Sequence, residues 1–247
     1  PAMFMTTVDL HTDAAIQITA SHHPFDRNGL KFFVGTGGLE GSDILKELLL
    51  NEGIDIRKKH ADCGLLIYEI LSLASEAQEC ISEAQGTVKS SDYMKDYAAR
   101  LRDMIISEVG KGEKPLQDYH IVVDAGNGVG GFYANEVLAP LGADISGSQF
   151  LEPDGTFPNH IPNPENETAM SFISDAVKKN NADLGVIFDT DVDRAACVDS
   201  SGNEINRNSL IALSSVMALE GNEGGTIVTD SVTSDGLKEF IECSLGG

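Results

Sequence analysis

Short apolar runs alternate with longer amphipathic stretches through the second half of the chain. A short apolar run predicts a buried strand, whereas apolar residues that recur at helical spacing predict a helix with one packed face. In chain order the pattern predicts a strand at 119–124, a helix at 129–139, a strand near 143–147, a proline-rich loop, a helix at 168–179, a strand at 183–188, an acidic loop, a strand at 195–199, a helix at 207–219, a strand beginning at 225–229 and a helix at 234–243. This alternation is typical of an α/β fold, in which mixed sheets are flanked by helices in layers.

The first half of the chain has fewer clear elements. Residues 15–18 alternate apolar and polar side chains, which predicts a strand. Ser42 is a suitable N-cap for a helix over residues 42–50. The apolar stretch 65–74 predicts a buried helix, because it is too short to span a membrane and is interrupted by Glu69.

A longer helix is predicted at 91–109, since its apolar residues share one helical face. These residues are Tyr93, Met94, Tyr97, Leu101, Met104 and Ile105. Glycine between Lys111 and Lys114, with Pro115 next, predicts a linker at 111–117. We therefore expect a first domain at 1–110, a second at 118–221 and the start of a third at 222–247.

Composition argues against two classes of partner. The chain has 39 acidic residues against 17 basic ones, and its formal net charge is −22. Nucleic acids and anionic membranes attract lysine and arginine, so we expect neither as a partner. A chain of 247 residues has room for roughly one and a half to two domains.

The cysteines and the first residue bear on location. The four cysteines form no CxxC pair and no signal sequence precedes them, which fits a reducing intracellular compartment, with the cytoplasm expected. Because the chain begins with Pro1 rather than Met, the sequence leaves open a targeting peptide before it, and hence a location in a plastid. The cysteines are Cys63, Cys80, Cys197 and Cys243.

Three carboxylates follow a short apolar strand in the stretch DTDVDR. Asp189, Asp191 and Asp193 are spaced two residues apart after the apolar run 184–188. In an extended segment residues two apart face the same way, so we expect the three carboxylates to point at one position. Oxygen ligands without His or Cys favour Mg²⁺, Mn²⁺ or Ca²⁺ there.

Three other interpretations of this acidic stretch are open to comparison. An EF-hand fails, because the positions that need Gly and Glu hold Arg194 and Ser200. An aspartyl-phosphate phosphatase would use Asp189 as its nucleophile, but such sites usually carry Thr or Val where Asp193 stands. The third interpretation is a solvated acidic turn, which an acidic chain offers readily.

The second chemical candidate is the stretch TASHHP at residues 19–24, which follows the predicted strand at 15–18. It holds Ser21 beside His22 and His23, and Lys31 follows in NGLKFF. A glycine turn could return the next strand so that the Lys31 ammonium reaches the serine. Each residue also has an ordinary interpretation, because serine is common in turns, histidines occur in loops and a lysine at a strand end is usually solvated.

The segment GNGVGG at 126–131 fits the GxGxxG pattern of dinucleotide-binding proteins. It follows the apolar strand 121–123, and Asp144 lies 18 residues past Gly126. Asp144 is expected to begin the next strand rather than end it, so this match to an NAD-binding dehydrogenase is weak.

Taken in order, TASHHP, NGLKFF, VVDAGNGVGG (122–131), EPDGTFPNHIPNP (152–164) and DTDVDR resemble the α-D-phosphohexomutase family of phosphoglucomutases and phosphomannomutases. The resemblance covers most of residues 14–240. It implies that Ser21 carries the phosphoryl group and that Lys31 and Arg194 are active-site cations, of which we expect Lys31 to be catalytic and Arg194 to bind substrate. From its place beside the serine we also expect His22 to be catalytic, as a base. The same resemblance implies that Mg²⁺, one ion per active site, binds to Asp189, Asp191, Asp193 and the phosphorylated Ser21. The chain departs from the family at His23, where Asn is frequent.

The resemblance also implies an activity. Such isomerases of carbohydrate metabolism move a phosphoryl group between the 1- and 6-positions of a hexose phosphate, through a phosphoserine and a bisphosphorylated sugar, with a glucose 1,6-bisphosphate-type activator. The family has four domains, so the chain is expected to hold the back half of domain I, domain II and the start of domain III, and to be inactive without domains III and IV. Residues 52–88 resemble the family least. The alternative is a non-catalytic remnant that binds phosphate or metal, but the intact Ser21, Lys31 and three aspartates favour the enzyme.

Overall fold

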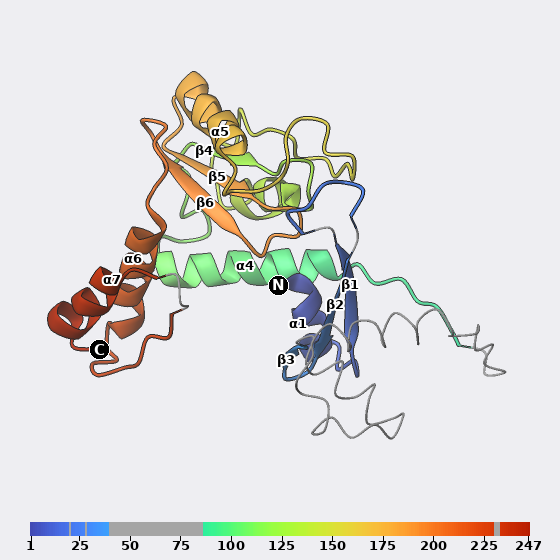
Figure 1. Cartoon of the computed structure of the whole chain (residues 1–247), viewed down its shortest axis with the longest axis horizontal. Helices are drawn as coiled ribbons and strands as arrows, with labels where there is room; N and C mark the ends of the chain where they lie inside the picture. The colour runs from blue at the N-terminus through green and yellow to red at the C-terminus, as the bar shows by residue number, and fades with distance from the viewer. Residues whose placement is uncertain (20, 28, 40–85, 230–232) are drawn as a thin grey trace, which may run out of the picture. The chain divides into compact units, whose positions relative to one another are not determined.

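A computed structural model of the chain describes residues 1–19, 21–27, 29–39, 86–229 and 233–247 (Figure 1). The chain forms two compact units, one made of Pro1–Ile18 and Leu30–Met94 and the other of Thr19–Gly29 and Lys95–Gly247. The predicted helices at 42–50 and 65–74 lie outside the described residues, as do Cys63 and Cys80.

The first unit contains helix α1 (Ala2–Asp9) and a three-stranded sheet in the order β1-β2-β3. The strands are β1 (Ala15–Thr19), β2 (Gly29–Val34) and the short β3 (Gly37–Gly38), so the predicted strand at 15–18 is confirmed. Helix α1 and strand β3 were not predicted. The Tyr93 hydroxyl donates a hydrogen bond of 2.5 Å to the carboxylate of Asp9, at the end of α1.

The second unit is built on the sheet β4-β5-β6, formed by β4 (Ile121–Asp124), β5 (Leu184–Phe188) and β6 (Ala195–Asp199). Strands β4 and β5 are parallel, whereas β6 is antiparallel to β5. The mixed sheet follows from the connections: two helices lie between the parallel strands β4 and β5, whereas only the acidic turn joins β5 to β6.

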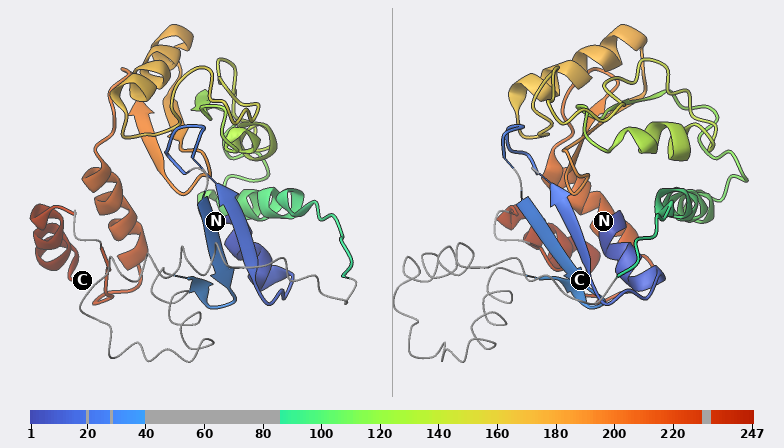
Figure 2. Two further views of the ribbon diagram at one scale, coloured as in Figure 1. Left: turned by 45° about the vertical axis from the view of Figure 1, so that its right-hand side comes forward. Right: turned by 90° about the vertical axis from the view of Figure 1, so that its right-hand side faces the viewer.

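Helices cover both faces of this sheet (Figure 2). Val122 and Ile187 pack against α5 (Glu167–Asn180), while Val123 and Phe188 pack on the opposite face against the π-helix η2 (Tyr133–Leu138). Neighbouring strand residues point to opposite faces, so the apolar runs are buried on both sides. The result is the predicted helix–sheet–helix layering.

Helix α4 (Tyr93–Val109) packs behind η2 and confirms the helix predicted at 91–109. Its packed face differs in part from the prediction. Ala98 and Ile106 lie on that face, whereas Met104 is 56% exposed. Ala98, Leu101 and Ile105 share the packed face because they are spaced at i, i+3 and i+7. Met104 does not fit this spacing, so its side chain points away from η2.

The strand predicted near 143–147 is wrong. Residues 144–149 make only isolated parallel bridges to the neighbouring strand, His120↔Asp144 and Asp124↔Gln149. Between the two bridges the chain advances four residues on the β4 side and five on the other side. The extra residue breaks the ladder, as in a β-bulge, and the Ser148 hydroxyl accepts the Val123 N–H in its place at 2.9 Å.

The C-terminal region contains α6 (Arg207–Leu219), α7 (Asp235–Phe240) and the π-helix η3 (Ile241–Leu245), which confirms the helices predicted at 207–219 and 234–243. The strand predicted at 225–229 is wrong. This segment belongs to neither sheet of the described residues, and Val228 is 89% exposed. In the part of the chain that the structure describes, no helix combines the length and apolar character needed to cross a membrane.

Candidate functional site

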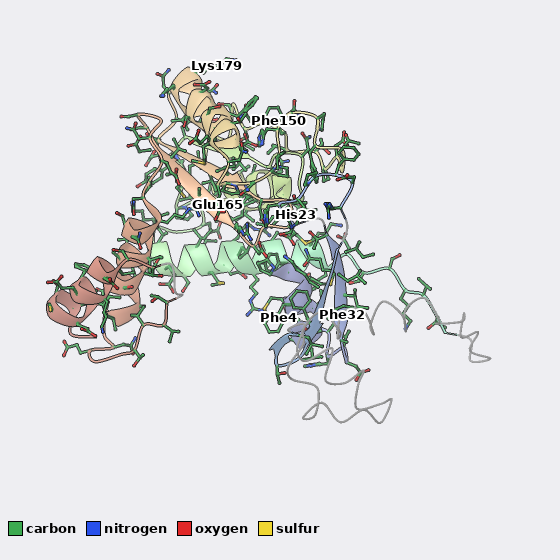
Figure 3. All side chains as sticks on the ribbon, viewed as in Figure 1. Phe4, His23, Phe32, Phe150, Glu165 and Lys179 are labelled. Atoms are coloured by element: carbon green, nitrogen blue, oxygen red, sulfur yellow. The ribbon has the colours of Figure 1, made fainter. Side chains whose placement is uncertain are left out.

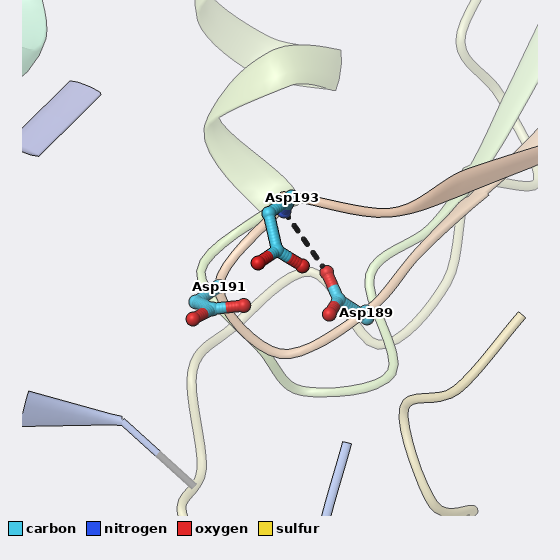
Figure 4. A group of neighbouring side chains, drawn as sticks. All are labelled: Asp189, Asp191 and Asp193. Atoms are coloured by element: carbon cyan, nitrogen blue, oxygen red, sulfur yellow. Dashed lines mark hydrogen bonds between the residues drawn. The ribbon is translucent and has the colours of Figure 1, made fainter. Parts of the chain in front are cut away.

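The three aspartates of DTDVDR meet at the end of β5. One carboxylate oxygen from each of Asp189, Asp191 and Asp193 lies within 4.8 Å of the others (Figure 4). Asp189 is fully buried and Asp191 is 7% exposed, whereas Asp193 is exposed. A solvated acidic turn would not bury two of its carboxylates, so that interpretation does not fit the structure.

The carboxylates converge through a turn, and the extended geometry expected from their spacing is wrong. Val192 has φ +63°, in the left-handed region that a β-branched residue rarely adopts. The Asp193 N–H, at 3.1 Å, and the Arg194 N–H, at 3.2 Å, both donate to Asp189 Oδ1. The chain thus folds back around the Asp189 carboxylate, and this brings Asp193 to it.

The buried Asp189 carboxyl has a strongly raised pKa. Burial raises the pKa of its carboxyl to about 7; the hydrogen bond from the Arg194 backbone lowers it in part, and Asp193 and Asp191 raise it. Within the described region the buried Asp189 Oδ2 has no hydrogen-bond partner. A buried acceptor without a donor, beside two more carboxylates, is suited to a cation, and an all-oxygen donor set suits Mg²⁺.

The serine loop belongs to the same compact unit as the acidic turn. Ser21 adopts φ +50°, and its N–H donates to the Thr19 hydroxyl at 2.8 Å. The Ser21 hydroxyl lies 3.3 Å from Nδ1 of His22, whose ring stacks on His23 with centroids 4.6 Å apart. A non-glycine residue held in the left-handed region is often found at a functional site.

His22 links this loop electrostatically to the acidic turn. Burial, followed by the Arg194 and His23 charges, lowers the pKa of His22, while Glu165 and Asp193 oppose that shift. The predicted residues Ser21, His22, Arg194 and the three aspartates therefore lie in one region of the second unit. A lowered pKa keeps the His22 imidazole neutral at pH 7, so it can accept a proton.

The sequence reasoning missed Glu165 and Arg207. The Arg207 guanidinium donates to Glu165 at 2.9 Å, and this bond, with the Arg207 charge, lowers the pKa of Glu165; Arg194 and His22 contribute further. Glu165 is labelled in Figure 3. The two residues lie at the ends of a loop and a helix, 42 positions apart, and line a cavity of about 550 Å³. The motif at 152–164 ends one residue before Glu165, so no role for this glutamate was predicted from the sequence.

Lys31 lies in β2, which belongs to the first compact unit. Its approach to Ser21 remains a prediction.

The glycine-rich turn serves the fold rather than a dinucleotide. A Cβ at Gly128 would lie 2.7 Å from the Thr190 carbonyl oxygen, and one at Gly131 would overlap the Leu151 carbonyl. The chain's own backbone therefore fills the space that a pyrophosphate would need. Asp144 lies at an isolated bridge beside β4, which also departs from the dinucleotide pattern.

Family models, curated relatives and solved structures all match this chain to the same family. The model of phosphoglucomutase/phosphomannomutase alpha/beta/alpha domain I matches residues 1–50, and that of domain II matches residues 91–202. Phosphoglucomutase of Neisseria gonorrhoeae is 29% identical over 242 residues, and phosphoglucomutase/phosphomannomutase of Thermococcus kodakarensis is 30% identical over 242 residues.

Each of these alignments covers 98% of this chain but 46% or 47% of the relative, so the chain spans about half the length of the curated relatives it matches. A crystal structure of a phosphoglucomutase/phosphomannomutase family protein from Burkholderia thailandensis superposes with a TM-score of 0.71 and 27% identity. The superposition covers 96% of this chain and 44% of the Burkholderia chain.

Proposed function

Because the chain belongs to the phosphoglucomutase/phosphomannomutase family, we propose that it carries the phosphoserine and metal-binding parts of a phosphohexomutase. In this proposal Ser21 passes a phosphoryl group to and from a hexose phosphate, between its 1- and 6-positions. A bisphosphorylated sugar of the glucose 1,6-bisphosphate type is the intermediate and the activator. The observation that carries the proposal is the convergence of three aspartates in the compact unit that also holds the serine loop.

The charge balance requires a cation at the acidic turn. A phosphoserine carries roughly −1.5 to −2 charges near pH 7, and it would join three carboxylates that already repel one another. Mg²⁺ bound to Asp189, Asp191, Asp193 and the Ser21 phosphate would offset that charge and stabilise the charge that develops during transfer. The buried Asp189 Oδ2 and the all-carboxylate donor set support this assignment.

The other residues of the proposed site bind phosphate and transfer the proton. Arg194 follows the acidic turn directly and supplies a guanidinium that can bind phosphate oxygens. His22, with its lowered pKa, can accept the proton of the attacking sugar hydroxyl. The sugar oxygen then bonds to phosphorus, the bond from phosphorus to Ser21 Oγ breaks, and Ser21 takes up a proton. We assign Lys31 to the same site as a second cation or as the base.

The domain division at 1–110, 118–221 and 222–247, with a linker at 111–117, is part of this proposal. We infer that sugar recognition requires the further length that the relatives have. Binding energy from the distal phosphate and the sugar hydroxyls positions the reacting group, so each transfer in the 247-residue chain should be slow and turnover poor, whereas phosphorylation of Ser21 can accumulate over a long incubation with excess bisphosphate.

A labelling experiment tests the proposal. The chain is incubated with Mg²⁺ and excess glucose 1,6-bisphosphate, and the phosphorylated residue is located by peptide mass spectrometry. The label is expected on Ser21, and it should be lost in Ser21→Ala and with chelator but kept in Ser107→Ala, which changes an exposed serine of α4. A label on Asp189 would support the aspartyl-phosphate alternative. No label on the wild type would support a non-catalytic remnant.

A further inference from the structure

A buried histidine and aspartate lie beside the glycine turn, and the proposed mechanism does not use them. His160 Nε2 lies 3.0 Å from Oδ1 and 3.1 Å from Oδ2 of Asp124, the last residue of β4. Their side chains are 1% and 0% exposed. Such a pair, buried at the end of β4, needs an explanation because buried charges are costly unless they are well paired.

The pair is not built as a proton-transferring dyad. His160 Nδ1 lies 3.0 Å from the Ile161 carbonyl oxygen, so both ring nitrogens face acceptors. Only the doubly protonated ring can donate to both, and that form has no lone pair with which to take a proton. Burial lowers the pKa of His160, but the hydrogen bond and charge of Asp124 outweigh it, and the net shift is upward.

The pair holds the first residue of the glycine turn. Asp124 Oδ1 also accepts the Gly126 N–H at 2.8 Å, while Gln149 Nε2 donates to Asp124 Oδ2 at 2.8 Å. Gly126 has φ +53°, and a Cβ there would lie 3.0 Å from His160 Cε1. The carboxylate of Asp124 therefore ties the imidazolium to the backbone of the turn.

The other end of the glycine turn contacts the acidic turn. The Val129 N–H donates to the Thr190 carbonyl at 2.9 Å, and Gly128 packs on the backbone of the same threonine. Thr190 lies between Asp189 and Asp191, two of the three converging carboxylates. The backbone that sets the spacing of these two carboxylates therefore rests on the glycine turn.

We propose that His160 is a positioning residue for the metal site: through Asp124 and the glycine turn, it fixes the backbone at Thr190. The inference rests on the proposed metal-binding function of the acidic turn. Residues outside the direct ligands commonly change metal affinity by about 10- to 100-fold, because ligand spacing must match the ion closely. His160 acts through hydrogen bonds alone and touches neither phosphate nor metal in this scheme.

The test compares His160→Gln with Val177→Ala, which removes apolar volume from the core beneath the same sheet. Two quantities are measured, the Mg²⁺ affinity by calorimetry and the hydrogen exchange of the Val129 amide in metal-free protein. His160→Gln is expected to weaken Mg²⁺ binding about 10-fold or more and to speed Val129 exchange. Val177→Ala should change affinity less than about 2-fold, because a general loss of stability does not alter ligand spacing.

Unchanged affinity and unchanged Val129 exchange in a folded His160→Gln variant would overturn the inference. If wild-type protein itself binds no Mg²⁺, the proposed function fails, and the exchange of Val129 in metal-free protein still decides whether His160 supports the turn. Should His160→Gln not fold, the wild type provides the reciprocal measurement, since coupling acts in both directions. Mg²⁺ should then slow exchange of the Gly126 amide, and an unchanged rate would overturn the inference.

Discussion

Replacement of Asp189 by Asn should stabilise the metal-free protein and abolish its metal site. The wild-type carboxyl is buried, and its pKa is raised from 3.8 to about 7. At about 1.4 kcal/mol per pKa unit, ionising it in the folded state costs on the order of 4 kcal/mol above pH 7. Asn keeps an oxygen to accept the two backbone N–H groups without a charge, so we expect a gain of about 2 to 4 kcal/mol at pH 8.

The sign of the pH dependence follows from the raised pKa. The stability that wild-type Asp189 provides is fully present below pH 3.8, where both folded and unfolded forms are protonated, and is lost as the pH rises through about 7. The free energies of unfolding of wild type and Asp189→Asn should therefore agree near pH 4 and separate toward pH 8.

Urea unfolding in chelator at both pH values measures this difference in the free energy of unfolding. When the unfolding is repeated with Mg²⁺, the ion should stabilise only the wild type. Asp175→Asn is the control, because Asp175 is an exposed acid of α5 outside the acidic turn. If Asp189→Asn proves less stable than wild type at pH 8 in chelator, the carboxylate has a structural role and the reasoning is refuted.

Three further predictions follow from the structure. Asp191→Ala should weaken Mg²⁺ binding strongly in calorimetry, and equal affinity in variant and wild type would contradict a three-carboxylate site. His160→Gln should cost about 2 kcal/mol of stability below pH 6.5, and its difference from wild type in urea unfolding should shrink as the pH rises through the raised pKa of His160; a difference that grows with pH would contradict the ion pair. The 247-residue chain should show little conversion of glucose 1-phosphate to glucose 6-phosphate in a coupled assay, and robust turnover would contradict the need for distal binding.

The elements that the sequence predicts well are those with local causes. The apolar run at 184–188 and the carboxylates after it form β5 and the acidic turn, because a strand buried on both faces needs a continuous apolar run. Helix α5 is likewise local, since Asn166 caps it by accepting the Ala169 N–H at 3.1 Å.

The failures depend on contacts between distant segments. The bridges at Asp144 and Gln149 are separated by a bulge that only the partner strand reveals. The Asp124–His160 pair joins residues 36 positions apart, and spacing carries no signal for it. The left-handed turn at Val192 was missed because its sequence alternates as an extended segment would, while its geometry is set by the backbone donors around Asp189.

The central claim is that Ser21 and the three aspartates hold one metal ion between them. Mn²⁺ bound in place of Mg²⁺ to chain phosphorylated at Ser21 tests it through the magnetic coupling between the ion and the phosphorus nucleus. The account predicts one bound Mn²⁺ with strong phosphorus coupling in the wild type and its loss in Asp191→Ala. Bound Mn²⁺ without phosphorus coupling, in protein that mass spectrometry shows to be phosphorylated at Ser21, would contradict the account.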